Sequence, residues 1–419
     1  MRRTCSALLL LLAITCSATA ADWPAFRGPT NDGISLESKA ATEWGPKKNV
    51  KWKSPLPRPG NGSPIVVANR VFVTSAEDAE GKRRSLYCFN ALDGKQLWAR
   101  TTKVDKVMPT HKTNPYAGTT PLSDGHRIVV WHATGGLKCY DLEGKELWSR
   151  NLGEFKHTWG YGTSPILLGE NLILHTGPGR RVFVTAITMA TGKTVWETDE
   201  PIEVEGLKNK KGQYQGSWCT PIVAHSGGKP QVIVAMNTRV NAYDPANGKV
   251  LWTVSGMRHA RGDLAYSSPV IAGDTVLVTG GYKGPMMAIR LGGLGDVTKS
   301  HRLWRHEKQP QSIGSGVFVG GHIYRPNAGP STIECIDAAT GKVTWTERAT
   351  GNQWASIIKV GDLLYATGQD GGTIVFRANP KKFDLFAKNK LGDSCNATPA
   401  VSDGRLYFRT AKHLWCVGE

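Results

Sequence analysis

The chain has 419 residues, of which 40% are hydrophobic and 21% are charged. This composition is typical of a globular protein and excludes a disordered, collagenous or coiled-coil chain. Lys and Arg number 52 against 34 Asp and Glu, so the formal net charge is +18. Because one hydrophobic core of this size would be unusually large, we expect several domains or one domain built from repeats.

Residues 1–20 have the pattern of a secretory signal peptide. Arg2 and Arg3 precede the apolar run 7–14, and the small residues at 18–20 predict cleavage before Ala21. A lipoprotein signal requires a small residue before its cysteine, and Thr15 before Cys16 fits that requirement poorly. No later stretch approaches the roughly 18 apolar residues of a membrane span. We therefore expect a periplasmic or secreted protein without a lipid anchor.

The chain after residue 20 stays basic, with 50 basic residues against 34 acidic ones and a net charge of +16. Outside the cytoplasm such a balance favours an anionic polysaccharide, lipid head groups or cell wall over nucleic acid. The basic residues are scattered, so we prefer to interpret them as an ordinary solvated, slightly basic surface. The expected partner is an envelope protein, an anionic polysaccharide or a small ligand, and the expected state is a monomer.

Residues 21–49 contain no repeat and are predicted to form an extended segment. From residue 50 to 419 the chain repeats, and one pattern of a small residue, an Asx or Thr, Gly-Lys and a final tryptophan recurs. Two clear copies run from Ala242 to Trp252 and from Cys335 to Trp345. The copies end at Trp98, Trp148, Trp196, Trp252, Trp304, Trp345 and, in a decayed copy, Phe386. We expect these tryptophans to be structural, each offering apolar area and one N–H donor between units.

Each repeat also opens alike, with a cluster of Gly, Ser or Thr and often a proline before an apolar run. Short β-rich segments such as 70–74 and 275–279 follow, separated by Asx-Gly or Thr-Gly turns. Four short strands per unit predict a propeller blade, because a lone sheet of this size cannot bury both faces. Seven units are complete and the last lacks a fourth strand, which residues 50–53 can supply. The sequence therefore predicts an all-β, eight-bladed propeller closed by its N-terminal strand, which removes the open sheet edges.

The cysteines fit packing better than chemistry. Cys88, Cys139, Cys335 and Cys416 share one position of the repeat, where other copies carry alanine or valine. A small apolar residue suits this position because the sheets pack closely face to face, and cysteine serves there as a small hydrophobe. Equivalent positions in neighbouring blades lie too far apart for a disulfide. We therefore expect free, buried thiols.

The pattern Ala-x-Asp-x-x-Thr-Gly-Lys-x-x-Trp resembles the tryptophan-docking motif of pyrroloquinoline-quinone (PQQ) type propellers. The opening run 22–29, Asp-Trp-Pro-Ala-Phe-Arg-Gly-Pro, is similar to the start of secreted propellers of this superfamily found in planctomycete-like bacteria. The superfamily also includes quinone-dependent alcohol dehydrogenases and a non-catalytic propeller of outer-membrane β-barrel assembly. The resemblance therefore implies the fold and leaves the activity open.

The sequence lacks several features of a quinone enzyme. Quinone-dependent alcohol dehydrogenases of the family usually carry an adjacent cysteine pair beside the cofactor, and this chain has none. The chain is also shorter than those enzymes. It contains neither the Cys-x-x-Cys-His of a c-type haem nor the His-Glu-x-x-His of a zinc site. We therefore predict no cofactor and no metal site.

The most plausible site is the mouth of the ring, where loops join each outer strand to the next inner strand. Three of these loops carry a histidine followed by an aromatic residue, at 111–116, 157–161 and 259–266. Aromatic faces with convergent polar groups suit a small-molecule or sugar site. The predicted ligand-binding residues of this funnel face are His111, Asn114, Tyr116, His157, Trp159, Tyr161, Trp218, Arg258, His259, Arg261, Asp263, Tyr266, Trp354 and Asn396.

The same residues also have a purely structural interpretation. Aromatic side chains at strand starts can fill the funnel, and histidines can cap loops through hydrogen bonds. If the protein is catalytic, the candidates for a base are Asp263 and Asp393. The arginines near Asp263 would favour its ionised form, so a salt bridge explains that residue equally well.

Two functions follow from the sequence. The first is an exported, non-catalytic propeller that binds a ligand, polysaccharide or protein partner at the funnel face. The alternative is a quinoprotein dehydrogenase oxidising an alcohol or sugar, with PQQ and Ca²⁺ in the funnel. The missing catalytic motifs favour the first.

Overall fold

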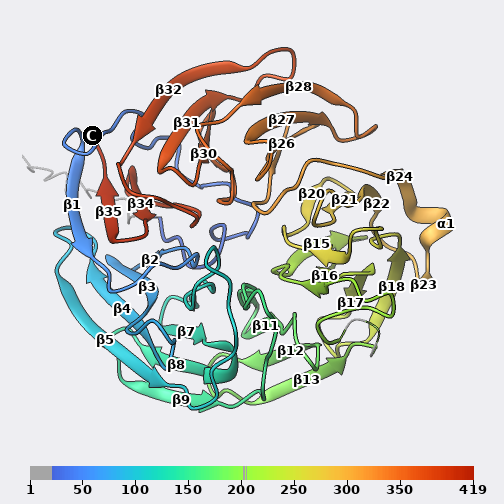
Figure 1. Ribbon diagram of the computed structural model, residues 1–419, viewed down its shortest axis with the longest axis horizontal. Coiled ribbons are helices and arrows are strands. Elements are labelled where there is room, and N and C mark those ends of the chain that lie inside the picture. The colour runs from blue at the N-terminus through green and yellow to red at the C-terminus, as the bar shows by residue number, and fades with distance from the viewer. Residues whose placement is uncertain (1–20, 202, 204) are drawn as a thin grey trace, which may run out of the picture.

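The computed structural model describes residues 21–201, 203 and 205–419, and the predicted signal peptide at 1–20 lies outside this part of the chain. Eight antiparallel sheets stand around a central axis like the blades of a propeller (Figure 1). The predicted all-β, eight-bladed architecture is confirmed. Helical structure is rare, with α1 (Thr298–His301) and a 3-10 turn at Ala133–Gly135. No described helix is long and apolar enough to cross a membrane.

Blades are numbered here in chain order, and the strands of each are given from the axis outward. Blades 1 to 4 each run through four consecutive strands, and in blades 1 to 3 the innermost strand is the shortest. Their strands are, in blade 1, β2 (Ile65–Val67), β3 (Arg70–Ala76), β4 (Arg83–Asn90) and β5 (Gln96–Lys103); in blade 2, β6 (Leu122–Ser123), β7 (Arg127–Trp131), β8 (Leu137–Asp141) and β9 (Glu146–Arg150); in blade 3, β10 (Ile166–Leu168), β11 (Asn171–His175), β12 (Phe183–Thr188) and β13 (Thr194–Asp199); and in blade 4, β15 (Ile222–Ser226), β16 (Lys229–Ala235), β17 (Arg239–Tyr243) and β18 (Val250–Ser255).

Blades 5 to 8 also have four strands each, but the strands of blades 5 and 8 are not all consecutive in the chain. Their strands are, in blade 5, β20 (Val270–Ala272), β21 (Thr275–Thr279), β22 (Met286–Arg290) and β24 (Arg302–His306); in blade 6, β25 (Val317–Val319), β26 (His322–Pro326), β27 (Thr332–Asp337) and β28 (Val343–Arg348); in blade 7, β29 (Ile358–Val360), β30 (Leu363–Thr367), β31 (Gly372–Arg377) and β32 (Asp384–Lys390); and in blade 8, β33 (Ala400–Ser402), β34 (Arg405–Arg409), β35 (His413–Val417) and β1 (Val50–Pro55). Two short strands outside these sheets, β14 (Gln215–Ser217) and β19 (Asp263–Ala265), pair in parallel beside the axis.

Blade 8 joins the two ends of the propeller domain. Its outer strand β1 comes from the N-terminal side and pairs antiparallel with β35, with Lys53 opposite Trp415. Figure 1 shows this pair as a blue strand beside a red one. The predicted closure is therefore confirmed, and it leaves no blade with a missing outer strand.

Outer-strand tryptophans link six of the eight blades to the next one. The indole Nε1 of Trp52 donates to the Ala91 carbonyl at 2.9 Å, and that of Trp196 donates to the Pro245 carbonyl at 2.7 Å. The glycine of the repeat lies under the indole of the preceding blade. A Cβ atom at Gly248 would stand 2.4 Å from the Trp196 ring, and the φ of Gly248 is +73°. Both the close approach and the left-handed backbone explain why the repeat needs glycine there.

Trp98, Trp148, Trp304 and Trp345 make the same inter-blade bond, at 2.9 to 3.1 Å. Trp252 in blade 4 does not, which corrects the expectation that every indole N–H links two blades. After β22 the chain folds back so that β23 (Gly295–Asp296) pairs with β18 and covers this outer strand. Trp252 is thereby fully buried and donates to Gln231 of its own blade at 2.9 Å. In blade 7 the equivalent residue is Phe386, whose side chain has no N–H to donate and which is 43% exposed.

All six described cysteines are free and buried, as predicted. Cys88 stands opposite Trp98 across β4 and β5, and Cys139 stands opposite Trp148 across β8 and β9. Burial raises the pKa of these two thiols to about 12. Both therefore stay protonated near neutral pH and act as small apolar side chains.

Residues 21–37 cross the central channel. Trp23 exchanges backbone hydrogen bonds with Val66 of blade 1, and the Arg27 side chain donates to the Gly316 carbonyl beside blade 6. The Lys359 amide of blade 7 donates to the Gly33 carbonyl at 2.8 Å. Because these blades lie on different sides of the ring, the segment spans the channel between them.

Candidate functional site

A cavity of about 390 Å³ lies on the axis of the ring, on the face where the inner strands begin. Its wall combines a ring of hydroxyl groups with one aromatic side and one amide side. The lining residues are Phe26, Asn61, His111, Thr113, Asn114, Gly118, Thr120, Trp159, Gly162, Ser164, Trp218, Thr220, Tyr266, Ser268, Tyr282, Gln311, Ile313, Ser315, Trp354, Ser356, Asn396 and Thr398. Phe26 belongs to the segment that crosses the channel.

Each blade contributes one serine or threonine just before its inner strand, and together these residues form the hydroxyl ring. Its members are Ser63, Thr120, Ser164, Thr220, Ser268, Ser315, Ser356 and Thr398. At seven of the eight steps the backbone N–H of one member donates to the hydroxyl of the next, at 2.9 to 3.1 Å. The hydroxyl ring therefore ties the inner ends of neighbouring blades together.

The hydroxyl ring has an unused hydrogen-bonding capacity. Within residues 21–419 as described, no member donates its O–H to a protein acceptor, and the step from Thr220 to Ser268 is not formed. Seven of the eight members line the cavity. Because each hydroxyl has one donor and two lone pairs, its proton stays free for a ligand or water.

Four residues from blades 3 to 5 form the aromatic wall, namely Trp159, Trp218, Tyr266 and Tyr282. The ring of Trp159 lies 5.8 Å from both Trp218 and Tyr282, and Trp218 lies 5.4 Å from Tyr266. Tyr214 stacks on Trp159 at 4.6 Å without lining the cavity. The contacts hold the rings at fixed angles, and their partly exposed faces offer a broad apolar surface.

Three asparagines from blades 8, 1 and 2 form the amide wall, namely Asn396, Asn61 and Asn114. Asn396 donates to the Asn61 side-chain oxygen at 3.2 Å, and Asn61 donates to the Asn114 side-chain oxygen at 3.2 Å. Asn114 in turn donates to the Trp159 carbonyl at 2.8 Å. These bonds fix the orientation of each amide before any ligand arrives.

The cavity wall carries no charged side chain from Asp, Glu, Lys or Arg. His111 is its one histidine, and burial raises the pKa of the Tyr266 hydroxyl, which therefore stays neutral. In the part of the chain that the structure describes, no group of three His, Cys, Asp or Glu residues is placed to hold a metal ion. The cavity is thus suited to hydrogen bonding and stacking rather than to ion pairing.

Half of the predicted funnel residues line this cavity. They are His111, Asn114, Trp159, Trp218, Tyr266, Trp354 and Asn396. The others lie outside its wall, because the loops that carry them turn their side chains away from the axis.

Tyr116 and Tyr161 pack on the buried guanidinium of Arg84 instead. The Arg84 carbon Cζ lies 4.9 Å from the Tyr116 ring and 5.4 Å from the Tyr161 ring. Arg84 also donates to the Tyr161 hydroxyl at 3.3 Å. These two tyrosines support the loops from behind and present no surface to the cavity.

His157 lies fully buried directly behind the aromatic wall. Its ring meets Trp218 edge-on at 4.8 Å, and its Nε2 lies 3.0 Å from the Gln215 carbonyl oxygen. Burial lowers the pKa of His157 to about 4, so the ring is neutral at pH 7. His157 therefore positions Trp218.

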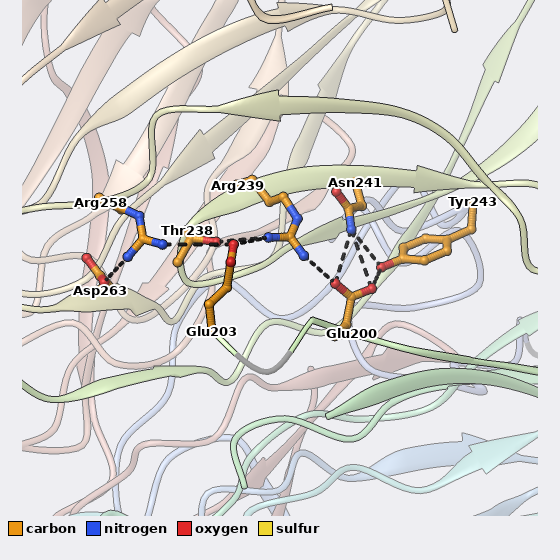
Figure 2. A network of polar contacts seen from close by, with 8 residues as sticks. All are labelled: Glu200, Glu203, Thr238, Arg239, Asn241, Tyr243, Arg258 and Asp263. Atoms are coloured by element: carbon orange, nitrogen blue, oxygen red, sulfur yellow. Dashed lines mark hydrogen bonds and ion pairs between the residues drawn. The ribbon is translucent and has the colours of Figure 1, made fainter. Parts of the chain in front are cut away.

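Asp263, a predicted base, does not reach the cavity. Its Oδ2 lies 2.7 Å from Nη1 of Arg258 and accepts a 3.0 Å bond from Asn209. Arg258 also lies 3.9 Å from Glu203 (Figure 2). Asp263 is thus a salt-bridge partner at the start of β19, which is one of the two interpretations that the sequence left open.

The same network continues away from the cavity toward blade 4 (Figure 2). Glu200 is bound by Arg239 at 2.9 Å, by Asn241 at 3.2 Å and by the Tyr243 hydroxyl. Arg239 also pairs with Glu203 at 3.0 Å. These contacts attach the loop after β13 to the residues of β17.

The remaining predicted residues are also outside the cavity wall. Asp393, the second candidate base, accepts hydrogen bonds from the Thr410 hydroxyl at 2.7 Å and from the Lys412 amide at 3.0 Å. His259 and Arg261 belong to the turn before β19, and Arg261 is exposed. Neither acid is therefore placed to take a proton from a molecule in the cavity.

The sequence-based prediction missed several lining residues. Phe26, Thr113, Tyr282 and Gln311 follow no repeat position, so no pattern marked them. Asn61 and Ile313 stand two residues before Ser63 and Ser315, the repeat position that Trp218, Trp354 and Asn396 occupy in their blades, but this position was not recognised. The hydroxyl ring did have a signal. In six blades a serine or threonine directly precedes the proline that marks the inner strand, as in Ser63-Pro64 and Thr398-Pro399, and that residue was treated only as part of a turn.

The family model described as "Outer membrane protein assembly factor BamB" matches residues 40–110 and 82–347. The chain belongs to this BamB family of PQQ-like propellers. A BamB from Burkholderia pseudomallei (strain K96243) is 25% identical over 426 residues, which cover 96% of each protein. A polyvinylalcohol dehydrogenase from a Pseudomonas species is 24% identical over 277 residues, which cover 58% of this chain and 42% of that enzyme.

Solved structures support the fold and no more. BamB from Moraxella catarrhalis superposes with a TM-score of 0.58 at 13% identity, covering 87% of this chain and 98% of that one. A quinohemoprotein alcohol dehydrogenase from Comamonas testosteroni superposes with a TM-score of 0.68 at 13% identity, covering 95% and 80%. A computationally designed protein, Ika8, reaches 0.59 at 11% identity, covering 92% and 100%. Since an assembly factor, an enzyme and a designed chain all match, the function has to be argued from the cavity.

Proposed function

We propose that this BamB-family propeller is an exported, non-catalytic binding or scaffold module that uses the funnel-face cavity to hold a ligand or partner. The observation that carries this proposal is the cavity wall, on which hydroxyls, amides and aromatic rings converge without Asp, Glu, Lys or Arg, and with His111 as its one histidine. Such a wall binds and orients but offers little for proton transfer. The relative from Burkholderia pseudomallei, an outer-membrane protein assembly factor that aligns over 96% of this chain, is consistent with this role.

The alternative, a PQQ-dependent dehydrogenase, requires groups that this cavity does not provide. PQQ carries carboxylates, which call for cationic partners when they are buried. Ca²⁺ prefers several oxygen ligands that include carboxylates. The wall has amide oxygens but no carboxylate and no Lys or Arg, and Asp263 and Asp393 are engaged elsewhere. These residues do not fit the cofactor, so we propose no step through it.

A calorimetric titration of the chain from residue 21 onward with PQQ, with and without Ca²⁺, tests this choice. We expect no heat of binding up to high micromolar quinone in either condition. Tight, stoichiometric and calcium-dependent binding would contradict the proposal and favour the dehydrogenase.

The proposed location is the periplasm or the cell exterior. It rests on the signal-like residues 1–20 and on the BamB family, which is named for outer-membrane protein assembly. Expression of the full chain in a Gram-negative host should give a product that begins at Ala21. A cytoplasmic product that still begins at Met1 would contradict export.

A further inference from the structure

We propose that the cavity binds an uncharged saccharide of one or two sugar rings, stacked on the aromatic wall and hydrogen-bonded by the amide wall. This inference rests on the proposed binding function and adds the chemical class of the ligand. Three features of the wall lead to it.

The first feature is the partly exposed aromatic surface on one side of the cavity. Trp159 and Trp218 both line the cavity, with ring centroids 5.8 Å apart and an interplanar angle of 31°, so together they offer an aromatic face to a ligand. The C–H groups on one side of a sugar ring pack well on such a face, while the hydroxyls around its edge stay free. The aromatic wall alone would suit any flat apolar molecule, so the choice of a saccharide also depends on the polar wall opposite.

Tyr282 extends this surface from a strained turn. Tyr282 and Lys283 have φ values of +51° and +64°, and Tyr282 is 41% exposed. A Cβ atom at the neighbouring Gly281 would stand 2.5 Å from the Tyr266 ring, so the turn lies directly on the aromatic wall. Left-handed backbone in a bulky residue is costly and is common at functional sites. The turn places the Tyr282 ring against Trp159, at the edge of the cavity.

The second feature is a polar side that both donates and accepts. The amide oxygens of Asn61, Asn114 and Asn396 each have two lone pairs, and each oxygen accepts at most one bond in the structure as described, from a neighbouring amide. They can therefore accept from a ligand hydroxyl, while the hydroxyl ring can donate to a ligand oxygen. A sugar presents hydroxyls that do both, whereas an apolar ligand would leave these groups unpaired at a cost.

The third feature is that the described wall carries no Asp, Glu, Lys or Arg, while its one histidine, His111, lies 2.7 Å from the Thr113 hydroxyl through Nδ1. A buried carboxylate, phosphate or ammonium group would find no side chain of fixed opposite charge there, which is unfavourable. This disfavours uronic acids, nucleotides and amino sugars with free amines inside the cavity. The volume of about 390 Å³ lies near the lower end for ligand sites, so one or two rings fit better than an enclosed polymer.

The test begins with an array of neutral and acidic glycans and the chain from residue 21 onward. Neutral disaccharides that bind, with cellobiose, maltose and N,N′-diacetylchitobiose as the first probes, are then titrated by tryptophan fluorescence and calorimetry. We expect saturable binding of at least one neutral saccharide with a change in tryptophan emission. Its uronic acid counterpart should bind at least about tenfold more weakly, because its charge finds no partner.

Variants separate stacking from hydrogen bonding. Trp159→Ala and Trp218→Ala should each weaken saccharide binding by about tenfold or more, and Trp159→Phe should restore part of the loss. Asn61→Ala should weaken binding through the amide wall. The matched control is Trp148→Phe on the outer rim, where the indole Nε1 donates to the Met189 carbonyl at 2.9 Å. Its saccharide affinity should equal that of the wild type.

The outcomes distinguish this inference from the proposed function. Equal binding of acidic and neutral glycans, or affinity unchanged in Trp159→Ala, would overturn the saccharide assignment. If no glycan binds but a selected uncharged peptide does, and Trp159→Ala abolishes that binding, the saccharide assignment fails and the binding function stands. If PQQ with Ca²⁺ binds tightly instead, both fail.

Discussion

The outer rim and the mouth of this propeller are built on opposite principles. At the rim, one contact recurs from blade to blade, with a tryptophan Nε1 bonded to the next blade and a glycine beneath the indole, as for Trp196 and Gly248. At the mouth, equivalent loops carry different residues, with asparagines on one side and aromatic rings on the other. Repetition at the rim satisfies a requirement that is the same for every blade. Variation at the mouth has no such explanation in the fold.

The hydroxyl ring lies between these two extremes. It repeats in every blade and ties the inner strands together, yet seven of its members also line the cavity. A repeated residue can therefore serve the scaffold and the site at once. The contrast between rim and mouth is open to several tests, taken here from the largest expected effect to the smallest.

Replacing Trp252 tests the rim at its most buried point. Trp252 is fully buried and bonded to Gln231 at 2.9 Å, and β23 covers its strand. We expect Trp252→Ala to lower the free energy of unfolding by about 4 kcal/mol, the cost of a large buried cavity. Urea denaturation measures this free energy of unfolding. The control Trp345→Ala removes a partly exposed tryptophan and should lower the free energy of unfolding clearly less. Equal losses would contradict the claim that the covering strand β23 makes Trp252 the more deeply buried tryptophan.

A pair of glycine variants separates close packing from backbone strain. Gly248 and Gly227 both have positive φ, +73° and +55°, but only Gly248 has a neighbour, the Trp196 ring at 2.4 Å from an added Cβ. We expect Gly248→Ala to cost about 3 kcal/mol and Gly227→Ala about 1 kcal/mol, because only the first adds a clash to the strain. Thermal unfolding of the two variants measures these losses of stability. Similar losses would mean that the contact with the Trp196 indole is not the reason for a glycine at position 248.

The buried histidines predict a loss of stability in mild acid. Burial lowers the pKa of His175 from 6.5 to about 4. Since the folded state favours the neutral ring, the stabilisation is fully present above pH 6.5 and is lost as the pH falls toward 4. We expect His175 to account for about 2 kcal/mol of this loss. The difference in unfolding free energy between pH 7.5 and 5 should shrink in His175→Asn and stay unchanged in His126→Asn, an exposed control.

The sequence predicted the fold well because the rim repeats. The Gly-Lys-x-x-Trp pattern marked five of the eight blades, and the unpaired segment 50–53 correctly predicted the closing pair of β1 and β35. The covering strand β23 was not predicted, since it follows a sequence that no other blade has.

The site was predicted only in part, because it depends on where side chains point rather than on where strands lie. Trp159, Trp218 and Asn396 were found as polar or aromatic residues near strand starts. Asp263 was selected for its charge, but Arg258 and Asn209 hold its carboxylate outside the cavity. Tyr282 was missed because its turn comes between the second and third strands of its blade, away from the loops that were searched.

The most direct test of the contrast is to replace one tryptophan at the mouth and one at the rim, and to measure unfolding and neutral-saccharide binding on both. We predict that Trp159→Ala lowers the unfolding free energy by about 1 kcal/mol and abolishes binding. Trp196→Ala should lower it by about 3 kcal/mol and leave binding unchanged wherever the protein stays folded. If Trp159→Ala instead destabilises the protein as much as Trp196→Ala and leaves binding intact, the aromatic wall merely fills the funnel and the central claim is wrong.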